Sequence, residues 1–437
     1  MTHRVSPPTE RGKLSSVSNS PSIIAASRLL VQLSPLLTAP VVARALGPDG
    51  RGYYAACFAA MILTPVVLGV GLPLVVRRRA ANESAARALR SVYLVLPIAI
   101  PFAVGVGILV EKTLLSEIAP HTGMLYIVGM GCSVLFIGTL CIQSILIAEQ
   151  RYRSIAVVQS VQPISLTVGI VIGWAAGSLT LDWILIVAAV SMFSSFVAGL
   201  ALTRIRLRGE RESIPRMFRE GVTYSGSQIA ETANVTLIQV LAVGVIGAAE
   251  TGFLAIAVTI AGLPLTIAHT VTAVIYKDAA VADRNSSVLS GIAIRVTVLA
   301  TAVPTVALAL SAPIAIPLIF GQAFAPAVDT TLIALSASVF LAGGYVLAQI
   351  LAAQNKGARM TVNQLAGLAI SVAFFFLFGS RLGANGAAIG LAAGWLTATS
   401  LHLISLKVPL RLLVPRPRDS KHFVAIVLRG KFDYETL

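Results

Sequence analysis

The chain has 437 residues, of which 56% are hydrophobic and 12% are charged, and its mean hydropathy is +0.86. A soluble protein of ordinary composition carries about 25% charged residues, so these values exclude a soluble globular chain. The formal net charge of +15 is compatible with nucleic-acid binding in principle, but the distribution of the basic residues described below argues against it.

Apolar segments of membrane-spanning length follow one another along the chain. About 20 helical residues cross a bilayer core at 1.5 Å per residue. Strands are disfavoured because the segments are apolar all round and do not alternate with period two. We therefore predict an all-α polytopic membrane protein with twelve transmembrane helices. The predicted spans are 22–43, 52–76, 91–110, 123–148, 155–176, 183–203, 222–246, 252–276, 288–319, 328–353, 360–379 and 385–407.

These spans divide into two six-helix lobes. The polar N-terminal residues lack a signal-peptide pattern and are predicted to be a disordered tail. The predicted organisation, in chain order, is a disordered cytoplasmic tail at 1–21, an N-terminal lobe at 22–203, a basic cytoplasmic linker at 204–221, a C-terminal lobe at 222–407 and a basic cytoplasmic tail at 408–437.

The basic residues gather in alternate connections between the spans. If the N-terminus is cytoplasmic, the cytoplasmic connections and tails hold 27 of the 33 Lys and Arg residues. The other side holds only Arg44, Arg51, Lys112 and Arg381, while Arg28 and Arg295 lie within spans. This asymmetry follows the positive-inside rule. It predicts a multi-pass protein of the cytoplasmic membrane with both termini in the cytoplasm, whose charge contacts anionic lipid and not nucleic acid.

Two local blocks recur about 200 residues apart. Residues 47–55 (GPDGRGYYA) after the first span resemble residues 247–255 (GAAETGFLA) after the seventh. Residues 145–151 (ILIAEQR) resemble residues 350–356 (ILAAQNK) after the tenth span. Each lobe therefore starts on the same side of the membrane, which predicts a parallel internal repeat. Glycine suits a tight turn, so the first pair of blocks is predicted to be structural.

Signatures of catalysis and of metal binding are missing from the sequence. It contains no Walker pattern, no zinc-ligand spacing among its five histidines and no paired carboxylates within a helix. The three cysteines all fall inside apolar spans, where small buried side chains are expected. We expect no enzyme activity, no cofactor and no metal.

Polar residues at membrane depth are the best candidates for a functional site, because they are costly unless they line a cavity or pair. Arg28 and Gln32 follow helical spacing in the first span, and Gln228, Glu231 and Asn234 do so in the seventh. We predict that these two stripes face each other across a central cavity. Arg28 would attract a phosphate group, and Glu231 would carry a proton or cation. Alternatively, the two charges pair to hold the lobes together, or Arg28 reaches the inner surface.

Other polar residues are weaker candidates for the cavity. Gln143, His269, Arg295 and Gln349 are the first among them, and Gln159, Gln162, Asn363 and Gln364 follow. A single glutamine in such a helix often forms a hydrogen bond between helices, and Arg295 could extend to the inner surface instead.

Several segments resemble a known family. Residues 43–53 (ARALGPDGRGY), 318–328 (LIFGQAFAPAV), 349–356 (QILAAQNK) and 383–388 (GANGAA) are similar to those of polysaccharide-export flippases. These belong to the multidrug/oligosaccharidyl-lipid/polysaccharide exporter superfamily, and the similarity covers most of residues 22–405. The resemblance implies two six-helix lobes, a central basic cavity that alternates between the two sides, and an undecaprenyl-pyrophosphate-linked oligosaccharide as cargo. Arg28 fits the cavity arginines of that family.

The sequence thus predicts a flippase that moves a lipid-linked oligosaccharide from the inner to the outer leaflet for cell-surface polysaccharide export. Its expected partners are the lipid-linked saccharide, membrane lipids and polysaccharide-assembly enzymes. A drug or metabolite/cation antiporter of the same superfamily is the first alternative. A membrane glycosyltransferase or polymerase is the second, and the short outer connections disfavour it.

Overall fold

The structure is a computed structural model, and it describes residues 21–81, 85–203, 205, 208–281 and 286–412. The predicted N-terminal tail lies outside the described residues, apart from Pro21. The predicted C-terminal tail does so from residue 413 onward.

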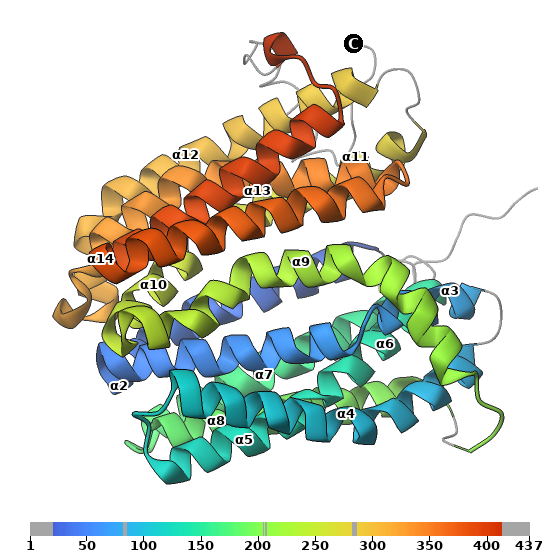
Figure 1. Cartoon of the computed structure of the whole chain (residues 1–437), viewed down its shortest axis with the longest axis horizontal. Coiled ribbons are helices and arrows are strands. Elements are labelled where there is room, and N and C mark those ends of the chain that lie inside the picture. Colours follow the sequence, from blue (N-terminus) through green and yellow to red (C-terminus); the bar gives the residue numbers. More distant parts are fainter. Residues whose placement is uncertain (1–20, 82–84, 204, 206–207, 282–285, 413–437) are drawn as a thin grey trace, which may run out of the picture.

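The described residues form helices that run along one common direction (Figure 1). We refer to α2–α8 as the N lobe and to α9–α14 as the C lobe. The N lobe contains α2 (Pro21–Leu68), α3 (Leu72–Ala81), α4 (Ala85–Leu114), α5 (Pro120–Ser133), α6 (Leu135–Ala148), α7 (Tyr152–Ala175) and α8 (Leu181–Thr203). The C lobe contains α9 (Ile214–Ile246), α10 (Ala248–Ala261), α11 (Leu265–Val281), α12 (Ser286–Phe320), η1 (Gln322–Phe324), α13 (Ala327–Ala353), α14 (Gly357–Ser405) and η2 (Leu410–Leu412).

Among the described residues, ten helical stretches are long and apolar enough to cross a membrane. Two of them, in α2 and α14, each consist of two helices joined at a glycine with non-helical angles, Gly47 and Gly383. The all-α membrane fold is therefore as predicted, whereas the count of twelve spans and the parallel repeat stay predictions. Helix α9 begins at Ile214, ahead of the predicted seventh span at 222–246, while its stretch apolar enough to span a membrane is Ser225–Ile246. Pro215 in the first turn suits this earlier start, since the first amides of a helix have no internal partner.

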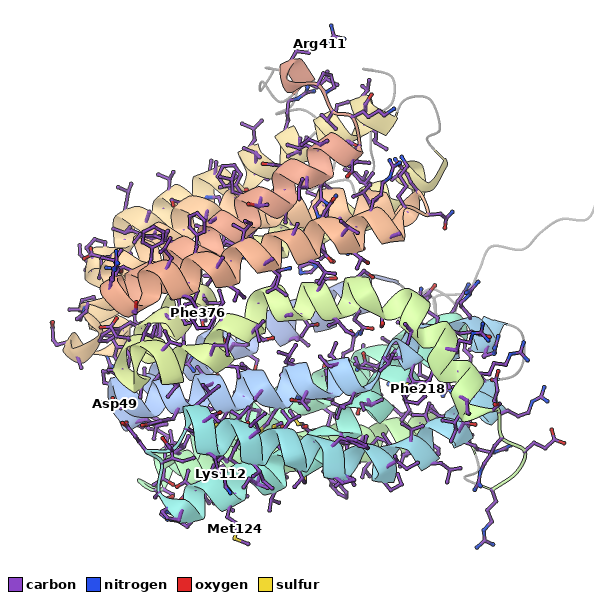
Figure 2. All side chains as sticks on the ribbon, in the orientation of Figure 1. Asp49, Lys112, Met124, Phe218, Phe376 and Arg411 are labelled. Atoms are coloured by element: carbon purple, nitrogen blue, oxygen red, sulfur yellow. The ribbon has the colours of Figure 1, made fainter. Side chains whose placement is uncertain are left out.

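The two ends of the bundle carry different features. The turn at Gly47 and the end of α4 lie at one end, which we call the turn end, and Asp49 and Lys112 mark it in Figure 2. The start of α9, marked by Phe218, lies toward the opposite end, which we call the linker end. Both blocks of the predicted repeat that begin with glycine lie at the turn end, and Gly47 and Gly247 both have positive φ, of 69° and 87°. Glycine adopts such angles without strain.

The first helix of each lobe makes an equivalent contact inside its own lobe. In the N lobe, Ser34 Oγ on α2 donates to the carbonyl of Pro163 on α7, at 3.2 Å. In the C lobe, Asn234 Nδ2 on α9 donates to the carbonyl of Gln364 on α14, at 3.1 Å. The donors are 200 residues apart and the acceptors 201 residues apart. This correspondence supports the predicted repeat at the level of packing.

The two repeated turns touch each other at the turn end. A Cβ atom at Gly52 would overlap the carbonyl oxygen of Ala248, and one at Gly252 would overlap the carbonyl oxygen of Pro48. Such overlap with backbone cannot be relieved by rotating a side chain. The N-terminal ends of α10 and of the second half of α2 therefore approach as closely as they do because both positions are glycine.

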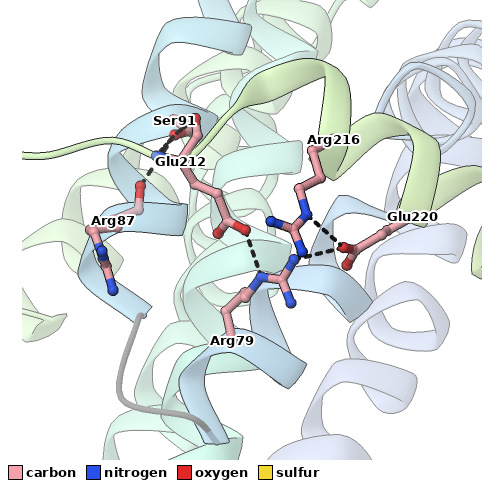
Figure 3. Close-up of polar contacts among 6 residues, drawn as sticks. All are labelled: Arg79, Arg87, Ser91, Glu212, Arg216 and Glu220. Atoms are coloured by element: carbon pink, nitrogen blue, oxygen red, sulfur yellow. Dashed lines mark hydrogen bonds and ion pairs between the residues drawn. The ribbon is translucent and has the colours of Figure 1, made fainter.

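The linker is held on the N lobe by a cluster of ion pairs (Figure 3). Arg79 on α3 contacts Glu212 in the linker and Glu220 on α9, each at 2.7 Å, and Arg216 contacts Glu220 at 3.5 Å. Ser91 on α4 donates to the carbonyl of Glu212 at 2.7 Å. The hydrogen bond from Arg79 holds the pKa of Glu220 below its ordinary value. The first turns of α9 are thus fixed to the N lobe, and farther along its length α9 packs against α2 of the N lobe and α14 of the C lobe.

Replacing Gly52 should test the contact between the turns. We expect Gly52→Ala to lower the free energy of unfolding by about 1–3 kcal/mol, the usual cost of overpacking. Gly105→Ala on α4 is the matched control, because a Cβ there meets nothing within 4 Å and alanine favours a helix. Thermal unfolding of the detergent-solubilised protein measures both. Equal midpoints for the two variants would contradict the close contact.

Replacing Arg79 should release the linker in a pH-dependent way. A carboxylate whose pKa is lowered by folding stabilises the protein above its unfolded pKa of about 4.3, and this contribution is lost as the pH falls through the lowered value. We therefore expect Arg79→Ala to be less stable than the parent at neutral pH, by about 1 kcal/mol for partly exposed pairs. The difference should shrink as the pH drops below about 4. Arg77→Ala, an exposed neighbour on α3, is the control, and a difference that does not vary with pH would exclude this role for the ion pairs.

Candidate functional site

A cavity of about 640 Å³ lies between the two lobes. Its walls come from α2, α6 and α7 of the N lobe and from α9, α10, α11 and α13 of the C lobe. This volume is in the range of sites that enclose a small organic ligand. The polar residues of the lining are Ser34, Thr38, Arg51, Tyr54, Gln143, Gln159, Gln162, Gln239, Thr259, His269 and Tyr345.

Arg51 brings a buried positive charge to this cavity. The residue is only 7% exposed, and its Nε has no hydrogen-bond partner among the described residues. No ion pair with Arg51 occurs in that part of the chain. Its guanidinium carbon lies 5.2 Å from the centre of the Tyr54 ring, a cation–π contact. A buried guanidinium without a carboxylate is costly and favours an anionic ligand.

The turn places Arg51 inside the molecule. Gly50 and Gly52 flank it, and Gly52 packs on the backbone of the second turn. Arg51 thus lies beside the contact between the two turns, and it is buried and not extended into solvent. The cation therefore lies at the part of the cavity nearest the turn end.

Amide and aromatic side chains supply the rest of the polar lining. Gln143 comes from α6, Gln159 and Gln162 from α7, and Gln239 from α9. An amide group both donates and accepts hydrogen bonds, so it matches hydroxyl and acetamido groups. Aromatic rings also line the cavity, at Tyr54, Phe58, Phe136 and Tyr345. The arrangement can bind an anionic group next to a polar uncharged one.

A second, smaller cavity of about 90 Å³ lies inside the C lobe. Glu231 and Asn234 on α9 line it together with residues of α11, α13 and α14, among them Gln364, Trp395 and His402. Gln364 Oε1 and Trp395 Nε1 are buried without a hydrogen-bond partner among the described residues. Asn363 Nδ2 lies 3.0 Å from His402 Nδ1 and 2.9 Å from Ser405 Oγ. This is a polar cluster with one carboxyl group and an unsatisfied amide oxygen.

The sequence pattern of the polysaccharide biosynthesis protein family (Polysacc_synt) matches residues 19–276, more than half of the chain. The chain belongs to this family. No curated protein sequence matches it.

Solved structures with the same fold include a flippase and multidrug transporters. The chain is similar to "Lipid II flippase MurJ, inward closed conformation", with 13% identity, a TM-score of 0.69 and coverage of 94% of this chain and 93% of that one. It is similar to the inward-facing conformation of a multidrug resistance MATE family transporter of the MOP superfamily (16% identity, TM-score 0.63, 89% and 98% coverage). It is also similar to the outward-facing conformation of such a transporter (16% identity, TM-score 0.60, 89% and 95% coverage). This family member therefore has the fold of MOP superfamily transporters.

The structure brings some of the predicted site residues into the interlobe cavity. Gln143 and His269 line it, and the His269 ring lies 4.4 Å from the Tyr345 ring. Arg28 and Gln32 lie on α2, but their side chains are outside the described part of the structure. Val31 and Pro35 of the same helix line the cavity. Arg28 and Gln32 as cavity residues stay predictions.

Other predicted residues lie elsewhere. Glu231 and Asn234 do not line the interlobe cavity, because the hydrogen bond from Asn234 to α14 directs that face of α9 into the C lobe. The prediction that this stripe of α9 faces the stripe of α2 across one central cavity is therefore corrected, because Glu231 and Asn234 line the C-lobe cavity instead. Gln228 and Gln349 are half-buried and are not among the interlobe lining. Arg295 is 4% exposed, lines a 210 Å³ cavity among α12, α13 and α14, and donates to the carbonyl of Leu412 at 2.8 Å.

Sequence reasoning missed Arg51 and Gln239. Arg51 was assigned to an outer connection, because the polar turn around it resembled an exposed loop. The repeat itself contains a signal, since the position 200 residues on is Thr251. A charge present in only one copy of a repeated turn is not needed for the turn. Gln239 gives no comparable signal, because a single glutamine in an apolar span is common.

Proposed function

We propose that this family member is a flippase that moves a lipid-linked oligosaccharide, carried on undecaprenyl pyrophosphate, from the inner to the outer leaflet for cell-surface polysaccharide export. Membership of a polysaccharide biosynthesis family and the transporter fold support this proposal. The observation that carries it is the buried Arg51 guanidinium in a cavity between two lobes. A diphosphate is the anionic group that such a cargo presents.

The orientation follows from the positive-inside rule. The basic linker begins α9 at the linker end, and the sequence assigns most Lys and Arg residues to the same side of the membrane as this linker. We therefore infer that the linker end faces the cytoplasm and that both termini lie there. The turn end then faces outward, in the cytoplasmic membrane. The cavity would open toward the linker end to admit the headgroup and toward the turn end to release it.

Each part of the cavity has a role in this scheme. Arg51 binds the diphosphate through forked hydrogen bonds, with Arg28 as a predicted second cation. Gln143, Gln159, Gln162 and Gln239 contact hydroxyl groups of the saccharide, and the aromatic rings pack against the less polar faces of the sugar rings. No bond is made or broken in this scheme, so the protein acts as a transporter and not as a glycosyltransferase or polymerase. Polysaccharide-assembly enzymes would supply and use the cargo.

Coupling to an ion is the second element of the proposal. The Glu231 cavity supports it, because its lining contains this carboxyl group and also Gln364, whose buried amide oxygen no described residue satisfies. Binding of a proton or a cation would satisfy such a group. A drug or metabolite/cation antiporter would use the same C-lobe site with a different cargo. Arg51 disfavours cationic drugs in the interlobe cavity.

Variants of Arg51 test the cargo site. We expect Arg51→Ala to abolish export of surface polysaccharide at unchanged protein level, because losing charge-assisted hydrogen bonds weakens binding roughly 10- to 100-fold. Arg51→Lys should keep partial activity, since it retains the charge without the fork. Arg381→Ala removes an exposed cation outside the cavity and is the control. Normal surface polysaccharide in Arg51→Ala cells would refute the cargo site.

The coupling role of Glu231 is tested with Glu231→Gln. In proteoliposomes with an imposed proton or sodium gradient, we expect this variant to bind cargo normally and to lose the stimulation of transport by the gradient. Glu117→Gln at the exposed turn end is the matched control. Gradient-stimulated transport by Glu231→Gln at the parent rate would exclude Glu231 as the coupling group.

A further inference from the structure

The first helix of each lobe crosses to the other lobe at the turn end. Ala39 and Ala43 of α2 are buried in the core formed by α10, α12, α13 and α14 of the C lobe. Reciprocally, Val240 and Val243 of α9 are buried in the core of the N lobe. The cavity is thus closed toward the turn end by two crossing helices.

The crossing of α2 ends in a polar contact. Arg44 Nε donates to the carbonyl of Ile319 at 2.9 Å, and its Nη2 donates to the carbonyl of Leu318. These carbonyls belong to the last turn of α12, which ends before Gly321 with φ of 106°. Such carbonyls have no partner within the helix and lie at the negative end of its dipole. One guanidinium therefore binds two free acceptors across the boundary between the lobes.

The crossing of α9 ends in an apolar contact at the equivalent place. Gly244 lies 200 residues after Arg44, and a Cβ atom there would lie 3.4 Å from the Cα of Leu114 and closer to its side chain. Leu114 is the last residue of α4, as Leu318 and Ile319 are near the last of α12. The two crossings thus reach the ends of α12 and α4, by a hydrogen-bonded fork in one case and by close packing in the other.

We propose that the Arg44 fork is the releasable latch of the turn end, and that it sets the balance between the closed state and a state open at that end. The inference rests on the proposed transport function and adds a residue to it. The other contacts of this end are steric: Gly52 and Gly252 lie against backbone carbonyls, and Gly244 lies against Leu114. The fork is the one interlobe hydrogen-bonded contact at the turn end among the described residues, and Arg44 is exposed. Water can therefore replace its two bonds when the lobes separate.

The latch can be tested by a distance measurement that needs no cargo. Spin labels are placed at Lys112→Cys on α4 and Gln322→Cys in η1, both exposed, in a background without Cys57, Cys132 and Cys141. The full chain is measured in lipid nanodiscs by double electron–electron resonance. We expect Arg44→Ala to raise the ratio of long to short distances roughly two- to fivefold. This is the change in an equilibrium constant that corresponds to losing the free energy contributed by a cation at a helix C-terminus. Arg44→Lys should lie between Arg44→Ala and the parent.

Two further variants keep the test decisive. Arg381→Ala, which removes an exposed cation of the C lobe, should leave the distances unchanged. Gly244→Leu should shift them further than Arg44→Ala, because its side chain collides with Leu114. If Gly244→Leu shifts the distances and Arg44→Ala does not, Arg44 is not the latch. If neither shifts them, this end does not open. Normal export by Arg51→Ala would refute the cargo site and leave the latch standing.

Discussion

The contact between the two repeated turns is the constraint on which the arrangement of the lobes depends. Gly52 and Gly252 each lie against a backbone carbonyl of the opposite turn, so the lobes meet at the turn end with no side chain between them. That approach lets α2 and α9 cross into the opposite cores. Arg51 precedes Gly52 in the first turn and is 7% exposed. The positive charge of the cavity therefore lies beside the packing contact between the glycines.

Next to this contact, a charged residue of a polar turn lies in the interior. An arginine in a short connection between two spans is ordinarily solvated, and burying it without a partner costs free energy. Arg51 is nevertheless buried, in only one of the two repeated turns, with its guanidinium over the Tyr54 ring. Buried charges retained against such a cost tend to mark functional sites in membrane proteins. The cavity is thus complementary to an anion before any anion enters it.

The fold class was accessible from the sequence because apolar length and the absence of period-two alternation decide it almost alone. The candidate site was accessible only in part. Gln143 and His269 were found because polar groups at membrane depth need a partner or a cavity. Glu231 and Asn234 were expected in the same cavity, but helical spacing shows only that two residues share a face, not which lobe that face contacts. The hydrogen bond from Asn234 to α14 decides this, and no local pattern encodes it.

The two halves share their framework and differ where function is proposed. Ser34 donates to a carbonyl of α7, and Asn234, 200 residues on, donates to a carbonyl of α14, which is a packing contact of the same kind in each lobe. Where the copies diverge, Arg51 corresponds to Thr251, Arg44 to Gly244, and Glu231 to Val31. Arg51 gives the interlobe cavity its cation, and Arg44 gives the crossing of α2 its hydrogen-bonded fork. Glu231 gives the C-lobe cavity its carboxyl group. In the proposed function, these differences in charge separate a cargo site between the lobes from an ion site within the C lobe. Helices α9, α11 and α13 each line both cavities, α9 through Gln239 and Glu231, and Tyr345 of α13 itself lines both. Helix α9 is also fixed to the N lobe at its start and packs into the N-lobe core near its end. Occupancy of the proposed ion site at Glu231 would therefore act on a helix that joins the two lobes.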